Sequence, residues 1–252
     1  MSDIFMQKAE RLFGLIGYPL SHSFSKRYFT EKFENENIAA CRYELFPIES
    51  VNDIRNIIHN NPTLCGLNVT IPYKEAVIPY LDNMTDAVHQ IGACNCIQIV
   101  DGKLTGYNTD VIGFEKMILP YLKSHHTKAL ILGTGGAAKA VAWVFNKLGL
   151  EYIYVSRDAG VNKISYSDID ASLMDAHKIV VNTTPLGMTP NTEGVPDIPF
   201  VYISREHLFI DLIYNPAKTR LLSIAEDKGA TIVNGMEMLI IQAEEGWKIW
   251  NQ

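Results

Sequence analysis

Short apolar runs alternate with longer segments of helical spacing along this chain, and that alternation limits the possible folds more than any other feature. The runs lie at residues 12–16, 43–46, 64–69, 97–100, 129–132, 152–155, 179–181 and 208–212. Their length and continuous hydrophobicity predict strands buried on both faces. Strands that alternate with helices predict an α/β fold with mainly parallel sheets.

Two domains are expected, because 252 residues exceed the usual size of one domain. The helical segments lie at residues 24–33, 51–58, 113–122, 137–148, 221–228 and 236–250. A polar stretch at residues 123–127 precedes the strand at residues 129–132, which indicates a nearby boundary. We expect a first domain of residues 1–110 and a second of residues 111–235, with the helix within residues 236–252 returning to the first.

A glycine-rich loop directly follows the apolar run at residues 129–132. It reads Gly133-Thr134-Gly135-Gly136-Ala137 and opens a segment of helical spacing. Backbone N–H groups at the start of such a helix can bind the pyrophosphate of a dinucleotide, so the loop predicts a Rossmann-type domain. The alternative is a tight turn between strand and helix that merely needs glycine.

The next strand ends in Val155-Ser156-Arg157-Asp158, about 20 residues after the loop, where dinucleotide-binding folds select the ribose. Arg157 favours the 2′-phosphate of NADP, since a guanidinium can pair with phosphate and stack on adenine. Asp158 favours the free 2′-hydroxyl of NAD. An exposed arginine that only ends a strand is the structural alternative.

A lysine and a carboxylate occur in two further motifs. Lys74 ends NVTIPYK, beyond a proline that should stop the strand, and we expect it at the start of a helix. Asp110 ends GYNTD. Reduction of a ketone by hydride leaves an alkoxide that needs a proton, which a lysine oriented by an aspartate can supply. Taken alone, Lys74 suits a surface lysine and Asp110 suits the N-cap of a helix beginning near Val111.

Charge, hydropathy and cysteine spacing exclude several classes of partner. A net charge of −6 without a basic run disfavours nucleic acid. No stretch has the features of a signal peptide or the length of a membrane span, so we expect a cytoplasmic protein that binds no membrane. Cys41, Cys65, Cys94 and Cys96 lack the spacing of a zinc site, so we expect no metal.

Taken in order, the motifs resemble those of the shikimate dehydrogenase family, and the resemblance runs over nearly the whole chain. The matching stretches are GYPLSHSFS at residues 17–25, NVTIPYK at 68–74, GACN at 92–95, GYNTD at 106–110, GTGGA at 133–137, NTTPLGM at 182–188, DLIY at 211–214 and GMEMLIIQA at 235–243. The resemblance implies an NADP-dependent oxidoreductase that reversibly reduces 3-dehydroshikimate to shikimate, on the route to chorismate and the aromatic amino acids. Its first domain would bind the substrate and its second the cofactor.

The family pattern also implies a role for individual residues. Lys74 and Asp110 become the catalytic pair. The substrate-binding residues become Ser23, Ser25, Thr70, Asn95, Asp110, Tyr214 and Gln242. The cofactor-binding residues become Gly133, Gly135, Gly136, Ala137, Ser156, Arg157, Ile213 and Gly235, with Thr184 and Met188 near the nicotinamide. Singly, Ser23 and Ser25 also suit helix caps, and Gln242 suits a buried amide satisfied by backbone.

Two positions depart from the family pattern. Ser156-Arg157-Asp158 replaces the usual Asn-Arg-Thr, and Lys163 is only a candidate for a second basic residue, so NAD stays possible. Lys26 replaces a proline, which leaves the hydroxyls of Ser23 and Ser25 in place. The alternatives are a quinate or quinate/shikimate dehydrogenase that uses NAD, and a non-catalytic sensor of the same metabolite. We expect a monomer or a homodimer.

Overall fold

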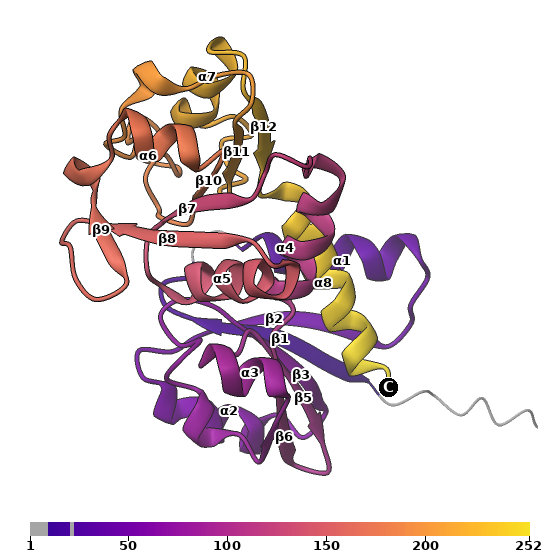
Figure 1. The fold of residues 1–252 in the computed structure, drawn as a ribbon. Helices are drawn as coiled ribbons and strands as arrows, with labels where there is room; N and C mark the ends of the chain where they lie inside the picture. The colour runs from indigo at the N-terminus through magenta and orange to yellow at the C-terminus, as the bar shows by residue number, and fades with distance from the viewer. Residues whose placement is uncertain (1–9, 21–22) are drawn as a thin grey trace, which may run out of the picture. The chain divides into compact units, whose positions relative to one another are not determined.

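The computed structural model describes residues 10–20 and 23–252, and the chain forms two compact units (Figure 1). The first unit contains the chain up to Thr109 and again from Ala243 onward, and the second is Asp110–Gln242. The sequence predicts the two joins after residues 110 and 235. Ser21 and His22 of the first family motif lie outside the described residues.

The first unit is built on a mixed six-stranded sheet with the order β2-β1-β3-β5-β6-β4. Its strands are β1 Arg11–Gly17, β2 Cys41–Pro47, β3 Leu64–Val69, β4 Asn83–Met84, β5 Cys96–Val100 and β6 Lys103–Tyr107. β1 pairs in parallel with β2 and β3, whereas β5 runs antiparallel to β3 and β6. Asp101 and Gly102 join β5 to β6, both at positive φ, as a tight hairpin turn requires.

The described residues of this unit also form short and medium helices. They are α1 Phe24–Asn35, η1 Val51–Asp53, α2 Ile54–Asn60, η2 Ile78–Tyr80 and α3 Asp86–Ile91, where η denotes a 3₁₀ helix. Ser23 starts α1, because its Oγ accepts the backbone N–H of Lys26 at 3.4 Å. Gly92 ends α3 at φ 69°, a left-handed conformation that glycine adopts without a steric penalty.

The second half of α8 Met236–Trp250 completes the core of the first unit. The ring of Phe13 stacks on Trp250 with centroids 5.0 Å apart, and Trp247 meets Phe13 edge-on at 5.3 Å. Trp250 Nε1 donates a hydrogen bond to the carbonyl oxygen of Ile97 at 3.0 Å. The last helix therefore returns to the first unit as predicted, but only from Ala243 onward, because its first half belongs to the second unit.

The second unit has a six-stranded sheet in which every pairing is parallel. Its strands are β7 Lys128–Leu132, β8 Glu151–Ser156, β9 Lys163–Ser165, β10 Ile179–Asn182, β11 Leu208–Asp211 and β12 Thr231–Asn234. The order is β12-β11-β10-β7-β8-β9, so the chain runs outward from β7 to β9 and then outward from β10 to β12. This is the strand order of the Rossmann fold, as predicted.

The same unit contains helices as well as this sheet. They are α4 Asp110–Ile118, η3 Leu119–Tyr121, α5 Gly136–Leu148, η4 Tyr166–Asp168, α6 Ala171–Ala176, η5 Phe200–Tyr202 and α7 Arg220–Asp227. α5 packs on β7 and β8, and α7 packs on β11 and β12 (Figure 1). Thr219 is the N-cap of α7, and its Oγ1 accepts the N–H of Leu222 at 3.4 Å.

Three expected strands are not buried on both faces, contrary to the prediction. In β5 only the first two residues are fully buried, and Val100 at its end is 55% exposed. Only Tyr43 is fully buried in β2, because β2 forms the edge of the first sheet. Only Val155 is fully buried in β8, whose outer neighbour β9 has just three residues and covers little of it. Strands at or near an edge have fewer helices packed against them, so their outer residues stay half-exposed.

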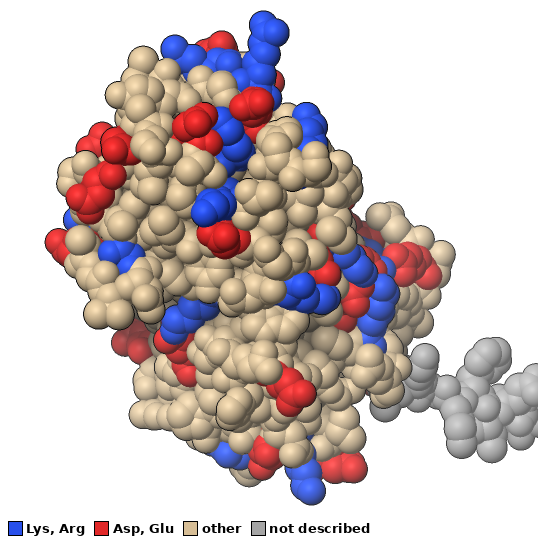
Figure 2. Space-filling model, in the orientation of Figure 1, with Lys and Arg blue, Asp and Glu red and all other residues tan. Residues whose placement is uncertain are grey.

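Acidic and basic side chains are interspersed on the face of the molecule shown in Figure 2. Exposed ion pairs such as Lys26–Glu44 at 2.7 Å and Lys218–Glu226 at 2.6 Å join some of them. Across residues 10–20 and 23–252, no helix combines the length and the hydrophobicity that a membrane span needs. The same residues contain no group of three metal-ligating side chains.

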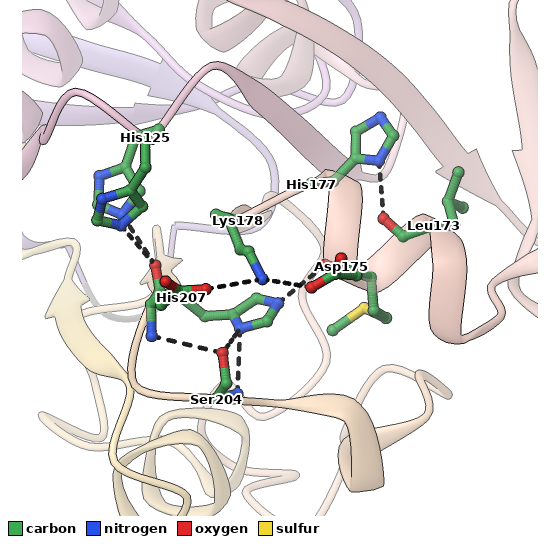
Figure 3. Close-up of polar contacts among 10 residues, drawn as sticks. His125, Leu173, Asp175, His177, Lys178, Ser204 and His207 are labelled. Atoms are coloured by element: carbon green, nitrogen blue, oxygen red, sulfur yellow. Dashed lines mark hydrogen bonds and ion pairs between the residues drawn. The ribbon is translucent and has the colours of Figure 1, made fainter.

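A buried histidine connects the segments that precede β7 and β11. His126 Nδ1 accepts the N–H of Lys123 at 3.1 Å, and its Nε2 lies 3.1 Å from the carbonyl oxygen of Glu206. Because Nδ1 accepts, Nε2 must carry the proton that the carbonyl receives, and the ring is neutral. His125 Nε2 lies 3.2 Å from the same carbonyl (Figure 3).

His207 repeats this arrangement at the start of β11. Its Nδ1 accepts the N–H of Ser204 at 3.1 Å, and its Nε2 lies 3.0 Å from the carbonyl oxygen of Met174 (Figure 3). Lys178 lies beside it and pairs with Asp175 at 2.7 Å and with Glu206. A proton added to Nδ1 of either histidine would face the backbone N–H that this nitrogen now accepts.

Acidification should therefore destabilise the second unit. Burial lowers the pKa of both His126 and His207, and nearby cations, Lys123 and Lys178 among them, lower it further. A base with a lowered folded pKa binds fewer protons when folded, so its stabilisation is complete above the unfolded pKa of about 6.5. That stabilisation is lost as the pH falls through the lower folded values. We expect urea unfolding between pH 7.5 and 5 to show a loss of at most about 2 kcal/mol for each histidine, because linkage limits the loss to about 1.4 kcal/mol per pH unit below the unfolded pKa.

Asparagine provides the matched variant, because its Oδ1 can accept the same backbone N–H without titrating. The double variant His126→Asn, His207→Asn should lose the acid dependence that these two rings cause, even if it is less stable at pH 7.5. It should keep the share of His177, whose pKa burial also lowers. His59→Asn, at an exposed position in the first unit, should keep it. An unfolding midpoint of the parent chain that stays constant over this pH range would disprove the account.

Candidate functional site

The glycine-rich loop leaves β7 through a residue that must be glycine. Gly133 has φ 111°, and its N–H donates to the carbonyl oxygen of Val155 at 2.8 Å. A Cβ placed there would lie 2.6 Å from Thr183 Oγ1. The loop after β7 therefore touches the loop after β10 at the point where the strand order reverses, which is where open parallel sheets bind ligands.

Gly135 serves a different purpose, since nothing in the described protein requires it to lack a side chain. Its φ of −77° is open to any residue, and a Cβ there would have no atom within 4 Å. Gly135 is the N-cap of α5 and offers no side chain to the helix N-terminus that Gly136 and Ala137 begin. The backbone N–H groups thus stay accessible to an anion, and a phosphate fits this position.

The end of β8 carries the residues predicted to face the ribose. Ser156 is the last residue of β8, and its Oγ donates to the carbonyl oxygen of Asp158 at 2.6 Å. Arg157 and Asp158 are both exposed. Burial raises the pKa of Tyr166, and the positive charge of Arg157 opposes this rise, so the guanidinium lies near that hydroxyl. A cation therefore stands at the expected place.

Loops after the remaining strands bring the other predicted cofactor residues to the same edge of the sheet. Thr184 follows β10, and both its N–H and its Oγ1 donate to Asn182 Oδ1, at 3.0 and 2.7 Å. Ile213 follows β11, and its carbonyl oxygen accepts the N–H of Gly235 at 3.1 Å. A Cβ on Gly235 would overlap the backbone of the preceding loop, so glycine is required there. Met188 is 46% exposed in the loop after β10.

In the first unit, a buried hydrogen-bonded chain leads from Ser25 into the sheet. Ser25 bonds to the hydroxyl of Tyr43, which donates to Asn68 Oδ1 at 2.7 Å. Burial raises the pKa of Tyr43 well above its usual value, and the bond from Ser25 opposes this. Ser23 is the N-cap of α1, as the structural alternative held, and nothing in that role prevents its hydroxyl from also meeting a substrate.

Lys74 lies in a turn, so the prediction that it begins a helix is wrong. The N–H of Val77 donates to the carbonyl oxygen of Tyr73 at 3.0 Å, and the 3₁₀ helix η2 follows. Lys74 is half-buried, and its own carbonyl oxygen accepts the N–H of Cys94 at 2.7 Å. Thr70 starts this turn, and its N–H donates to the carbonyl oxygen of Ile16 at 3.0 Å.

The same segment also holds the chain just before Asp110. Asn95 Oδ1 accepts the N–H of Thr109 at 2.7 Å, and Asn95 Nδ2 donates to Thr109 Oγ1 at 3.0 Å. Asn108 Nδ2 donates to the carbonyl oxygen of Ala93 at 2.9 Å. Asp110 follows as the first residue of α4 and is buried, one residue earlier than the expected helix start.

The last two predicted substrate residues belong to the second unit. Tyr214 follows Ile213 and is half-buried. Gln242 is buried on α8, and its Nε2 donates to the carbonyl oxygen of Leu239 at 3.0 Å, as the alternative of a backbone-satisfied amide held. The structure thus brings the cofactor residues together at one sheet edge and ties Lys74 and Asn95 to one segment.

Sequence patterns missed several buried polar residues that organise these loops. Tyr43, Asn68 and Asp211 fall at the ends of or inside apolar runs, and that interruption was the available signal. The cavities found in the second unit lie elsewhere. One of about 560 Å³ is lined by residues of β8 and β9, among them Lys163, the candidate second basic residue. One of about 340 Å³ lies beside α7 and β12 and includes no predicted site residue.

Known proteins match the chain in sequence and in structure. Residues 15–97 match the family model of the shikimate dehydrogenase substrate binding domain. The chain is 37% identical over 250 residues to a shikimate dehydrogenase (NADP(+)) of Staphylococcus epidermidis, covering 94% of this chain and 91% of the relative.

Solved structures agree with this match. A shikimate dehydrogenase crystallised with NADP⁺ has a TM-score of 0.84 and 32% identity, covering 96% of this chain and 90% of that one. The shikimate 5-dehydrogenase of Thermus thermophilus, in complex with NADP(H) and shikimate, has a TM-score of 0.84 and 27% identity, covering 95% and 93%.

The two loop glycines should respond oppositely to replacement by alanine. Gly133→Ala combines a positive φ with a contact at 2.6 Å and should cost about 1–3 kcal/mol or more of stability in urea unfolding. Gly135→Ala should change stability by less than about 1 kcal/mol. Its methyl group would stand in front of the α5 N-terminus, so NADP⁺ affinity should fall in calorimetric titration. Unchanged affinity in Gly135→Ala would remove phosphate binding from this loop.

Proposed function

Because the chain belongs to the shikimate dehydrogenase family, we propose that it interconverts 3-dehydroshikimate and shikimate with NADP(H). The step belongs to the route towards chorismate and the aromatic amino acids. The observation that carries the proposal is the match over 94% of the chain to a protein named shikimate dehydrogenase (NADP(+)). The family resemblance read from the motifs is thereby confirmed.

The cofactor would be held by the second unit. Gly135 leaves open space before the N-terminus of α5, which fits the pyrophosphate, and Arg157 at the end of β8 fits the 2′-phosphate. Thr184, Met188 and Ile213 would face the nicotinamide half, from the loops after β10 and β11. Glycine is required at residues 133 and 235 because a Cβ there would clash with other parts of the protein itself.

Neutral hydrogen-bonding side chains would recognise the substrate. We assign Ser23 and Ser25 to its carboxylate, and Thr70, Asn95, Asp110, Tyr214 and Gln242 to its hydroxyls and ring. A small polyhydroxy acid has little apolar surface, so its binding depends on such groups. The bond between Ser25 and Tyr43 would hold one of the serine hydroxyls in place.

Lys74 and Asp110 would manage the proton of the reaction. Bound NADPH supplies the hydride that reduces the ring ketone. The oxygen then needs a proton, which the Lys74 ammonium gives or shares by a hydrogen bond, while the Asp110 carboxylate orients that ammonium. In the oxidising direction Lys74 takes the proton back from the hydroxyl.

Backbone bonds support this pairing of residues 36 positions apart in the sequence. Cys94 N–H holds the carbonyl oxygen of Lys74, and the side chain of its neighbour Asn95 holds Thr109. Asp110 is joined to Thr109 by a peptide bond. One rigid segment thus fixes the backbone at Lys74 and next to Asp110, as a catalytic pair requires.

Finer expectations accompany this function. A cytoplasmic location and a monomeric or homodimeric state remain predictions from the sequence. NADP is the cofactor we propose, with Asp158 as the residue that would have to dominate if NAD were used instead. Quinate oxidation with NAD, or metabolite binding without turnover, are the outcomes that would replace the proposal.

Initial rates test the function directly. Purified protein would be given shikimate or quinate, each with NADP⁺ or NAD⁺, and reduced cofactor would be followed by its absorbance. We expect fast turnover with shikimate and NADP⁺ only. Preference for quinate or NAD⁺ would move the protein to the other dehydrogenase activity. Tight shikimate binding without turnover in any combination would indicate a sensor.

Replacement of Lys74 tests the proton step. Lys74→Ala should lower kcat by about 100- to 10,000-fold, the usual contribution of acid–base catalysis, with a much smaller change in the KM for shikimate. The fold should survive, because the backbone oxygen of Lys74 makes the bond to Cys94. Asp110→Asn should show a loss of kcat in the same direction.

The exposed Lys103 on β6 gives a matched control, and Lys103→Ala should keep the parent kcat. Near-normal turnover in Lys74→Ala would remove Lys74 from the chemistry while leaving the dehydrogenase activity itself intact.

A further inference from the structure

Two polar side chains end apolar strands in the middle of the second sheet and are fully buried. Asn182 is the last residue of β10, Asp211 is the last of β11, and the two are partners in the parallel register. Both are 0% exposed. A carboxylate in such a place is costly unless hydrogen bonds replace its water, so its partners show what it holds.

Every hydrogen bond recorded for Asp211 reaches a different part of the chain. Its Oδ1 accepts Asn182 Nδ2 at 3.1 Å and the N–H of Ile213 at 3.1 Å. Its Oδ2 accepts Thr219 Oγ1 at 2.7 Å. Burial raises the pKa of Asp211, and these three bonds oppose that rise. The carboxyl thus links β10, the loop after β11 and the N-cap of α7.

Asn182 extends the link into the loop after β10. Its Oδ1 accepts hydrogen bonds from both the backbone N–H and the hydroxyl of Thr184. Its Nδ2 also donates to the carbonyl oxygen of Leu186 at 3.4 Å. The two loops fastened in this way carry Thr184, Met188 and Ile213. No hydrogen bond recorded for Asp211 or Asn182 involves the β8 end, where Arg157 lies.

We propose that Asp211, acting through Asn182, is a positioning residue for the nicotinamide half of the cofactor. Its carboxylate fixes the loops after β10 and β11 against each other, so that the groups facing the nicotinamide are in place before the cofactor arrives. The assignment rests on the proposed function, because it presupposes a dinucleotide at this edge. It separates the site into an adenosine half that Asp211 does not control and a nicotinamide half that it does.

A comparison of two ligands tests the separation on the full-length protein. NADP⁺ occupies both halves, whereas adenosine 2′,5′-bisphosphate occupies only the adenosine half. Asp211→Asn keeps the shape of the side chain but removes its charge and turns one acceptor into a donor. Calorimetric titration should show NADP⁺ binding weakened about 10- to 100-fold, the contribution of one charged hydrogen bond. Adenosine 2′,5′-bisphosphate should bind within about twofold of the parent.

Asp170→Asn is the matched control, since Asp170 also accepts a backbone N–H, that of Leu173 at 2.8 Å, within the same unit. It should leave both ligands unaffected. If Asp211→Asn is not folded, as judged by circular dichroism, Thr219→Val and Thr219→Ser replace it. Thr219→Val should weaken the binding of NADP⁺ but not that of adenosine 2′,5′-bisphosphate. Thr219→Ser, which keeps the hydroxyl, should bind NADP⁺ as the parent does.

Three results would overturn the inference. Equal weakening of both ligands would show that Asp211 only stabilises the unit, and no weakening of either would show that the loops hold their places without it. Weaker binding of adenosine 2′,5′-bisphosphate alone would show that Asp211 positions the adenosine half of the site and not the nicotinamide half. A failure of the proposed function is recognised separately, because the unmodified protein would then bind no NADP⁺ at all.

Discussion

The place where the second unit can bind a ligand depends on the reversal of strand order at β7. β8 and β9 lie on one side of β7 and β10 to β12 on the other, so chain connections leave the centre of the sheet in opposite directions. With right-handed crossovers, the loops after β7 and β10 then diverge and leave the carboxyl edge open between them. Gly133 approaches Thr183 at this point. The residues assigned to the cofactor lie on the loops around it.

Different side chains fix the loops at the two ends of the parallel strands. At the carboxyl ends, a buried carboxylate and an amide accept hydrogen bonds from backbone and hydroxyl donors of the loops. At the amino ends, two neutral histidines bridge backbone groups of the segments that enter the strands. The hydrogen bond that each imidazole Nδ1 accepts ends when the ring is protonated. We therefore expect acidification to act at the end of the sheet that has no assigned catalytic role.

Hydrophobic periodicity was sufficient to predict the sheet strands with long apolar runs, and it failed where position in the sheet decides burial. β2 and β8 were predicted to be fully buried, because composition does not reveal that β2 is an edge strand and that β8 lies next to one. The hairpin partner β6 was missed, although Asp101-Gly102 is a strong turn signal that would have revealed it. β9 has only three residues, and β12 has only two apolar residues between Thr231 and Asn234, so neither forms a detectable apolar run.

The site shows the same division between local and distant information. Motif order identified the glycines, but only the structure distinguishes Gly133, which the backbone requires, from Gly135, which faces open space. Lys74 was expected in a helix because a proline ends the preceding strand, yet a bond to Cys94, twenty residues away, holds it in a turn. The partners of Asp211 likewise come from separate loops, which no local pattern predicts.

The division of the first unit into two pieces has a consequence for protein synthesis. The second unit is one continuous stretch, whereas the aromatic core of the first unit needs Trp247 and Trp250 from the far end of the chain. While the ribosome is still adding residues, β1 and β5 lack the helix that covers them and the Trp250 bond to Ile97. The nucleotide-binding unit can thus mature first on the nascent chain, and the unit that carries Lys74 is completed last.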